Sequence, residues 1–408
     1  MVLISTRVPD TSVRRLAATL YGYAFLSDLV LLYPLYALLF SDTGLSVWQI
    51  SALFAVWSAA GLVLELPSGA WADTVSRRLL LCLAPLCAAA GFALWVLVPS
   101  YPAFAAGFVL WGAGGALRTG ALEALVFTEL DRGGAAGRYA RVIGRARTAE
   151  VLAVMASIAL AGPVFAWGGY PAVGAASVLV CLLAAAVATG FPEHRAADVP
   201  AGAAARVPGG PGEGRGWWGS LRCGLAEVRA DARVRRAVLL VAVVTAVWDA
   251  VGEYVPLLAR ESGVAESTVP LLVLLVWAGV TVGGLLAPVG ERWGRRGLAG
   301  LLALAASALA AGAGVGRPAG FVLIAVAFAA FQLATVLTGA RLQASITGPG
   351  RATVTSLAGM GTDLTIVGVY GAYGLVATAA GNRAAFVWAA VPYLAVAALV
   401  ALGRRARA

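Results

Sequence analysis

Long apolar runs separated by short polar clusters are the main pattern of this chain. Each run reaches or exceeds the roughly 20 residues that an α-helix needs to cross the hydrocarbon core of a bilayer. The pattern predicts an all-α membrane protein with twelve transmembrane helices. The runs cover residues of about 16–40, 46–73, 79–99, 102–130, 139–167, 170–191, 237–259, 267–290, 297–316, 319–346, 352–379 and 384–403.

The composition agrees with a membrane location. Of 408 residues, 61% are hydrophobic and 12% are charged, and the mean hydropathy is +0.86. The surface of a water-soluble globular domain needs more charge than this. All 30 basic residues are arginines and His194 is the only histidine, so the sequence offers almost no side chains for imidazole catalysis or metal binding. Since P-loop, His-Glu-x-x-His and Gly-x-Ser-x-Gly motifs are also absent from the sequence, we expect no enzyme, no metal site and no cofactor.

A net charge of +10 would also suit a nucleic-acid-binding protein. The arginines, however, lie in short clusters between the apolar runs, which is typical of topology signals and not of a nucleic-acid-binding face. If the chain crosses the membrane at every run, one side receives nearly all of the arginines in loops and termini. The other side receives only Arg260, Arg317 and Arg383. By the positive-inside rule, both termini and the central loop are cytoplasmic, and we expect a multi-pass protein of the cytoplasmic (inner) membrane.

The central segment, residues 193–236, separates residues 1–192 from residues 237–408, and each of these parts has six apolar runs. Its first part contains Val-Pro-Gly-Gly-Pro-Gly-Glu-Gly, which is typical of a flexible linker. In residues 217–236, Leu221, Leu225 and Val228 follow helical spacing among several arginines. This stretch is either a short amphipathic helix on the inner leaflet or a solvated basic linker.

Two stretches of the chain match each other at fixed spacing. The first is Glu65-Leu-Pro-Ser-Gly69-Ala-Trp-Ala-Asp73-Thr-Val-Ser-Arg77-Arg78, and the second is Ala287-Pro-Val-Gly-Glu291-Arg-Trp-Gly-Arg295-Arg296. They resemble the loop motif Gly-x-x-x-Asp-[Arg/Lys]-x-Gly-[Arg/Lys]-[Arg/Lys] of the major facilitator superfamily, which joins helices 2 and 3 and, as a weaker copy, helices 8 and 9. The first copy departs from the motif at Thr74 and Ser76. The resemblance implies a conformational gate formed by Glu65, Gly69, Asp73, Arg77, Arg78, Glu291, Arg295 and Arg296.

Further matches between the two halves extend this resemblance to the whole chain. Asp28, Tyr33 and Ser41 lie 221 residues before Asp249, Tyr254 and Ser262. Gly137, Arg138 and Glu150 lie 213 residues before Gly350, Arg351 and Asp363. Duplication of a six-helix unit produces such repeats. The resemblance therefore implies two pseudo-symmetric six-helix bundles with a central cavity.

Four carboxylates fall at mid-membrane depth in this arrangement. At 1.5 Å of rise per residue, Asp28, Glu150, Asp249 and Asp363 each lie about 18 Å from the cytoplasmic end of their run. Placing a charge at that depth costs free energy, so we expect each of these carboxylates to have a partner or a function. Neither Asp28 nor Asp249 has a base nearby in the sequence, and Glu253 lies one helical turn beyond Asp249. We expect Asp28, Asp249 and Glu253 to form the centre of protonation and cation recognition.

Three more charged residues lie within the apolar runs. Arg147 precedes Glu150 by three residues, which suits an ion pair that either opens during transport or is a fixed structural link. Arg118 and Glu123 lie deep in the fourth run. Members of the family often carry an arginine in helix 4 that is tied to proton coupling, but the spacing Arg118-Thr-Gly departs from their Arg-x-x-x-Gly pattern.

The segment Thr119-Gly-Ala-Leu-Glu-Ala-Leu looks like a helix-4 segment of some bacterial drug exporters of this superfamily. The antiporter signature Gly-Pro-x-x-Gly-Gly is broken, because Gly162-Pro163 is followed by a glycine pair only at Gly168-Gly169. The resemblance implies proton-coupled efflux of a drug or natural product, driven by the proton motive force. The alternatives are a proton symporter that imports a small organic solute and a transport-inactive sensor or assembly protein. We expect a monomer in the lipid bilayer that binds a small organic substrate and protons.

Overall fold

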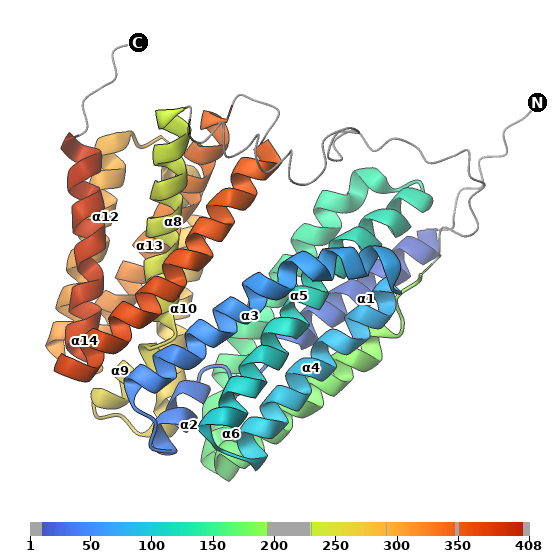
Figure 1. The fold of residues 1–408 in the computed structure, drawn as a ribbon, viewed down its shortest axis with the longest axis horizontal. Helices are drawn as coiled ribbons and strands as arrows, with labels where there is room; N and C mark the ends of the chain where they lie inside the picture. The colour runs from blue at the N-terminus through green and yellow to red at the C-terminus, as the bar shows by residue number, and fades with distance from the viewer. Residues whose placement is uncertain (1–9, 194–228, 230, 291, 347–350, 403–408) are drawn as a thin grey trace, which may run out of the picture. The chain divides into compact units, whose positions relative to one another are not determined.

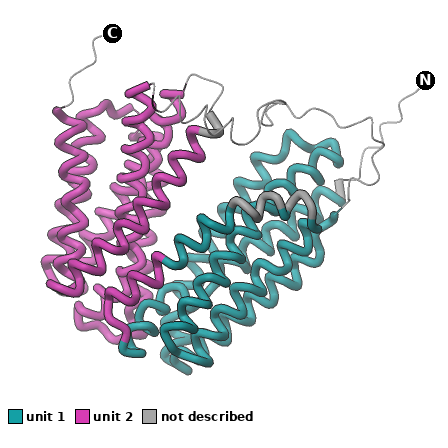
Figure 2. Tube along the Cα trace, in the orientation of Figure 1, with its two compact units in different colours: residues 1–44, 56–204 teal, residues 45–55, 205–408 magenta. Residues whose placement is uncertain are grey.

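The computed structural model describes residues 10–193, 229, 231–290, 292–346 and 351–402 (Figure 1), without the side chains at 10–11, 66–70, 72–74 and 351–353. Every regular element within these residues is a helix. The chain divides into two units (Figure 2). Unit 1 comprises Met1–Gly44 and Val56–Ala204, and unit 2 comprises Leu45–Ala55 and Ala205–Ala408. The predicted linker and amphipathic helix fall almost wholly outside the described residues, so the predicted domain boundaries at 192 and 237 stay predictions.

The helices of unit 1 are α1 (Asp10–Asp28), α2 (Tyr36–Asp42), most of α3 (Val47–Thr74), α4 (Arg77–Leu97), α5 (Tyr101–Arg132), the 3-10 turn η1 (Ala136–Arg138) and α6 (Tyr139–Ala188). Within this unit α4 packs against α5 and α6, and α1 packs against α6. The long α6 contains two spans, because Gly168 and Gly169 leave the helical conformation and Gly169 adopts a φ of 61°. A left-handed φ of this kind favours glycine, so the chain turns back at this point.

The helices of unit 2 are α8 (Ala232–Gly252), α9 (Val255–Glu261), η3 (Glu266–Thr268), α10 (Val269–Leu285), α11 (Ala287–Gly290), α12 (Arg295–Val315), α13 (Gly320–Ser345) and α14 (Arg351–Leu402). A second turning point divides α14 at Gly381, whose φ is 84°. The first residues of α3 also belong to this unit, where Tyr254 Oη donates a hydrogen bond of 2.7 Å to Ser51 Oγ.

The described helices confirm the prediction of an all-α chain with twelve spans. Seven helices are long and apolar enough to cross a membrane singly, and α8 with α9 forms an eighth span that is bent by 48°. Since α6 and α14 each contain two spans, they add two more. The remaining two are α5 and the broken pair α1 and α2.

The breaks between α1 and α2 and between α8 and α9 occupy corresponding places in the repeat that the sequence predicts. A break in a helix exposes backbone N–H and C=O groups, which need partners inside a bilayer because water is absent there. At the first break the N–H of Leu32 donates a hydrogen bond of 3.0 Å to Ser177 Oγ in the second half of α6. Leu32 and Ser177 are both fully buried. A side chain from a distant helix therefore stabilises the interruption of α1.

We expect Ser177→Ala to lower the stability of the protein by about 1–3 kcal/mol, because it leaves the buried N–H of Leu32 without an acceptor. The matched control is Ser157→Ala in the same helix. Ser157 is equally buried and its hydroxyl donates to the carbonyl of Val154, as that of Ser177 does to Val173, but it accepts no backbone N–H from a broken helix. Thermal unfolding of the two variants in detergent compares them directly. Equal losses in both variants would contradict the role assigned to Ser177.

Candidate functional site

Asp28 and Arg118 form an ion pair inside unit 1. Nη1 of Arg118 lies 3.3 Å from Oδ1 and 3.2 Å from Oδ2 of Asp28. Asp28 is the last residue of α1, directly before the break, and Arg118 lies in the middle of α5. Their side chains are only 25% and 26% exposed, respectively. The carboxylate of Asp28, which has no base nearby in the sequence, thus pairs with an arginine 90 residues away.

This ion pair lines a small cavity of about 60 Å³. The buried hydroxyls of Tyr23 and Ser27 face the same region, and neither finds a protein partner of normal hydrogen-bond geometry among the described residues. Buried polar atoms normally have partners, so unsatisfied ones beside an ion pair indicate a place for water or for polar groups of a ligand. The cavity therefore combines a negative charge, a positive charge and two hydroxyls without a partner of normal geometry among the described residues.

An aromatic cluster forms one side of this region. Trp111 of α5 lines the cavity and stacks on Trp57 of α3, with ring centroids 4.7 Å apart and planes 14° apart. Tyr33, in the break after α1, meets the edge of Trp111 at 6.4 Å. Large, rigid rings beside a few convergent polar groups are typical of small-molecule sites. The cavity can therefore offer both apolar surface and hydrogen bonds to an organic ligand.

A second charged group in unit 1 links α5 to α6. Arg147 lies 3.1 Å from Glu150 and 3.4 Å from Glu123 of α5. The side chains of Arg147 and Glu123 are 61% and 57% exposed, whereas that of Glu150 is 14% exposed. Glu150 also acts electrostatically on Arg118. The charge of Glu150 therefore connects this network with the ion pair of Asp28.

The helices that carry two of the predicted acids of unit 2 pack against each other, with Asp249 in α8 and Asp363 in α14 (Figure 1). Asp249 is exposed although its neighbours Trp248 and Ala250 are buried. The negative charge of Asp363 acts on Asp249. Glu253 follows the last residue of α8 and lies in the turn before α9. The structure thus couples Asp249 with Asp363 of α14, and the expected pairing of Asp249 with Glu253 stays a prediction.

The predicted gate residues can be followed only in part. Only the backbone is described at Gly69 and Asp73, and Glu291 lies outside the described residues. Glu65, Arg78 and Arg296 are exposed. Arg77 donates to the carbonyl of Ala124 and to Thr128 Oγ1, at 3.2 and 2.9 Å, and so ties the start of α4 to α5. Arg295 donates to the carbonyl of Val400 at 3.2 Å. The gate itself stays a prediction.

Two residues at these loops were missed by sequence reasoning. Glu193 caps the start of α4, since its carboxylate accepts hydrogen bonds from the N–H of Arg77 and from Ser76 Oγ. Arg341 of α13 donates to the carbonyls of Trp293 and Gly294, at 2.8 and 3.4 Å. In the sequence, Glu193 is interpreted only as the start of a linker. Its position directly after an apolar run could have indicated a role at a helix end.

Comparisons with known proteins agree with this fold. Residues 18–329 match the family model described as the Major Facilitator Superfamily. A variant of the nucleoside transporter NupG is 12% identical with a TM-score of 0.75, covering 95% of this chain and 99% of that one. A bacterial homologue of the human lysosomal transporter Spinster is 17% identical with a TM-score of 0.70, covering 96% of each chain. A D-xylose-proton symporter is 15% identical with a TM-score of 0.62, covering 95% of this chain and 96% of that one. No curated protein matches the sequence.

We expect the ion pair to be visible as a coupling energy in a double-mutant cycle of Asp28→Asn and Arg118→Gln. Each single variant leaves one half-buried charge without its partner, and the double variant removes both charges. The double variant should therefore be more stable than the sum of the two single effects predicts, by about 1–3 kcal/mol. Thermal unfolding in detergent measures this difference. Strictly additive effects would contradict the pairing.

Proposed function

This chain belongs to the major facilitator superfamily, and we propose that it is a secondary transporter that moves a small organic molecule across the cytoplasmic membrane in exchange for protons. The proton motive force drives the movement, and no bound cofactor is involved. The observation that carries the proposal is the ion pair of Asp28 with Arg118, which lies at a helix break and lines a cavity with unused hydroxyls. An ionisable group inside a membrane is a candidate functional residue, because placing a charge there is energetically unfavourable and such residues are retained mainly where they serve a function.

The pair supplies a simple switch. When Asp28 is ionised, its charge is balanced by Arg118 at 3.2 Å. A proton that binds to Asp28 removes this balance, because an arginine keeps its charge. A protonated Asp28 also no longer attracts a cationic group of the substrate, so a proton and a cationic substrate compete for one carboxylate. Competition of this kind is the negative coupling that exchange requires.

In unit 2, Asp249 and Asp363 supply a second site that can bind a proton or a cationic group. Two carboxylates that act on each other in a medium of low polarity repel one another. A proton or a cationic group of the substrate relieves this repulsion. Asp249 is exposed while its helix neighbours are buried, so its carboxylate lies on a face of α8 that the rest of unit 2 leaves uncovered. We therefore assign Asp249 to recognition of protons or cations, with Glu253, in the turn after α8, as its expected partner.

The second candidate is a proton symporter that imports a small organic solute. One observation favours it over export. Gly168 and Gly169 form the turn between the two spans of α6, so they cannot complete a helical Gly-Pro-x-x-Gly-Gly signature with Gly162 and Pro163. Residues 119–125 nevertheless resemble a segment of bacterial exporters, and for this reason we favour proton-coupled efflux over import.

Transport in membrane vesicles of opposite orientation separates these functions. Under an imposed pH gradient with an acidic interior, everted vesicles should accumulate a fluorescent organic cation if the protein exchanges it for protons. Accumulation only in right-side-out vesicles with an acidic exterior would favour the importer. Absence of gradient-dependent flux in both orientations across a broad substrate panel would contradict transport and favour a sensor or assembly protein.

We expect Asp28→Asn and Asp249→Asn each to abolish uphill transport while expression is retained, because each removes a carboxylate that takes part in proton exchange. The matched control is Asp42→Asn. Asp42 ends α2 beyond the break and accepts a hydrogen bond from Tyr170, away from the cavity of Asp28. Gradient-driven uptake is measured for all three variants. Normal coupling in the double variant of Asp28 and Asp249 would overturn the assignment.

A further inference from the structure

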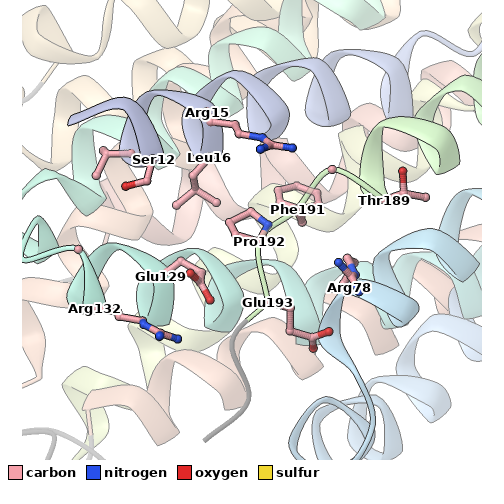
Figure 3. A pocket seen from close by; sticks show the side chains of 13 residues that line it. Ser12, Arg15, Leu16, Arg78, Glu129, Arg132, Thr189, Phe191, Pro192 and Glu193 are labelled. Carbon is pink, nitrogen blue, oxygen red and sulfur yellow. The ribbon is translucent and has the colours of Figure 1, made fainter. Parts of the chain in front are cut away.

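A separate, larger cavity of about 530 Å³ lies at one end of unit 1 (Figure 3). Four chain segments line it: the first two turns of α1, the start of α4, the last turn of α5 and the residues that follow α6. All four are at the ends of spans, on the face that the positive-inside rule assigns to the cytoplasm. The cavity is therefore placed at the edge of the membrane and not at its centre.

Three arginines from three helices contribute to this cavity. Arg15 of α1, Arg78 of α4 and Arg132 of α5 lie around Pro192 and Glu193 (Figure 3). All three are exposed, and no ion pair or side-chain hydrogen bond joins any of them to another residue that the structure describes. Arginine is always protonated and presents a planar set of N–H donors. The cavity thus holds positive charge and donors that none of the described residues uses.

The carboxylates of the cavity do not cancel this charge. Glu193 faces it, but its two oxygens are occupied by the N–H of Arg77 and the hydroxyl of Ser76, at 2.6 and 2.5 Å. It therefore serves as the cap of α4. Among the described residues of the lining, Glu129 is the only other acidic one. Three guanidinium groups against two carboxylates leave the cavity positive.

Apolar side chains form the rest of the wall. Val13, Leu16 and Phe191 line the cavity and belong to a buried hydrophobic cluster to which α1, α4, α5 and α6 contribute. Leu16 is also the point at which the first apolar run begins. The guanidinium groups consequently lie beside the boundary between hydrocarbon and water, where the phosphates of a lipid leaflet are found.

We propose that this cavity binds the phosphate head group of an anionic phospholipid of the inner leaflet. The guanidinium groups of Arg15, Arg78 and Arg132 match the oxygens of a phosphodiester, since arginine can donate two parallel hydrogen bonds to such a group. The apolar wall suits the glycerol and the first acyl carbons. A soluble phosphate compound shares the charge but has no use for the apolar wall, so the lipid is the better occupant. This site is independent of the transport proposed above.

The test is a titration of the full-length protein, purified in a neutral detergent, with a short-chain phosphatidylglycerol. Native mass spectrometry and the shift in melting temperature report binding. In the double variant Arg15→Gln/Arg132→Gln the affinity should fall at least about tenfold, because two charge-assisted contacts are lost. The matched control is Arg14→Gln/Arg141→Gln, which removes the same charge from exposed positions outside the cavity. Its affinity should stay within about twofold of the unchanged protein, as for surface charges with no contact to the ligand.

Two further ligands identify the source of the phosphate. Phosphatidylcholine of the same chain length carries no net charge and should bind weakly, and glycerol 3-phosphate tests a soluble phosphate. Equal binding of phosphatidylcholine, an equal loss in the control variant or full binding by the double variant would overturn the site. Binding of glycerol 3-phosphate as tight as that of phosphatidylglycerol would overturn the lipid as its occupant. If the double variant does not fold, Arg15→Gln and Arg132→Gln are measured singly, and unchanged affinity in both rejects the proposal.

Discussion

A bilayer core offers no hydrogen bonds, so a polar group that enters it needs a partner from the protein. The break after α1 illustrates the constraint. Leu32 loses its helical acceptor there, and Ser177 replaces it from α6. Asp28, on the other side of the same break, is balanced by Arg118 of α5. Helices α5 and α6 thus each contribute one side chain that stabilises the interruption beside the cavity of unit 1.

The same constraint gives the arginines different roles according to depth. Arg118 lies inside the bundle and is paired with a carboxylate. Arg77 lies at a helix end and donates to a backbone carbonyl and a hydroxyl, which fixes α4 against α5. Arg15 and Arg132 lie at the membrane edge, where water and lipid phosphates are available, so they need no protein partner. One residue type thus serves as a charge partner, a structural tie and a surface donor.

Close packing of helices holds these groups in place. Gly279 and Gly283 of α10 face the backbone of α13, where a Cβ atom would lie 2.3 and 2.0 Å from the carbonyl oxygens of Ala325 and Ala329. In the first half of the chain, a Cβ atom added to Gly114 of α5 would likewise lie 2.5 Å from the carbonyl oxygen of Ala84 in α4. Small residues at such contacts let helices approach closely in a membrane, where the hydrophobic effect does not drive them together. Gly114 also lines the cavity of Asp28, so packing and site share one residue.

The sequence by itself determined the all-α class, the twelve spans and the internal repeat, because span length and hydropathy follow directly from the thickness of a bilayer. It also indicated Asp28, Arg118, Glu150 and Asp249 as costly charges, and the spacing of Arg147 and Glu150 allowed their contact. Only the tertiary structure decided the partners. Arg118 pairs with Asp28 across 90 residues of sequence, and the carboxylate of Glu193 caps the start of α4. The charge of Asp363 in α14 acts on Asp249 in α8, the helix packed against it. Spacing along one helix predicts contacts within that helix, whereas contacts between helices depend on how the helices pack, which a single sequence does not specify.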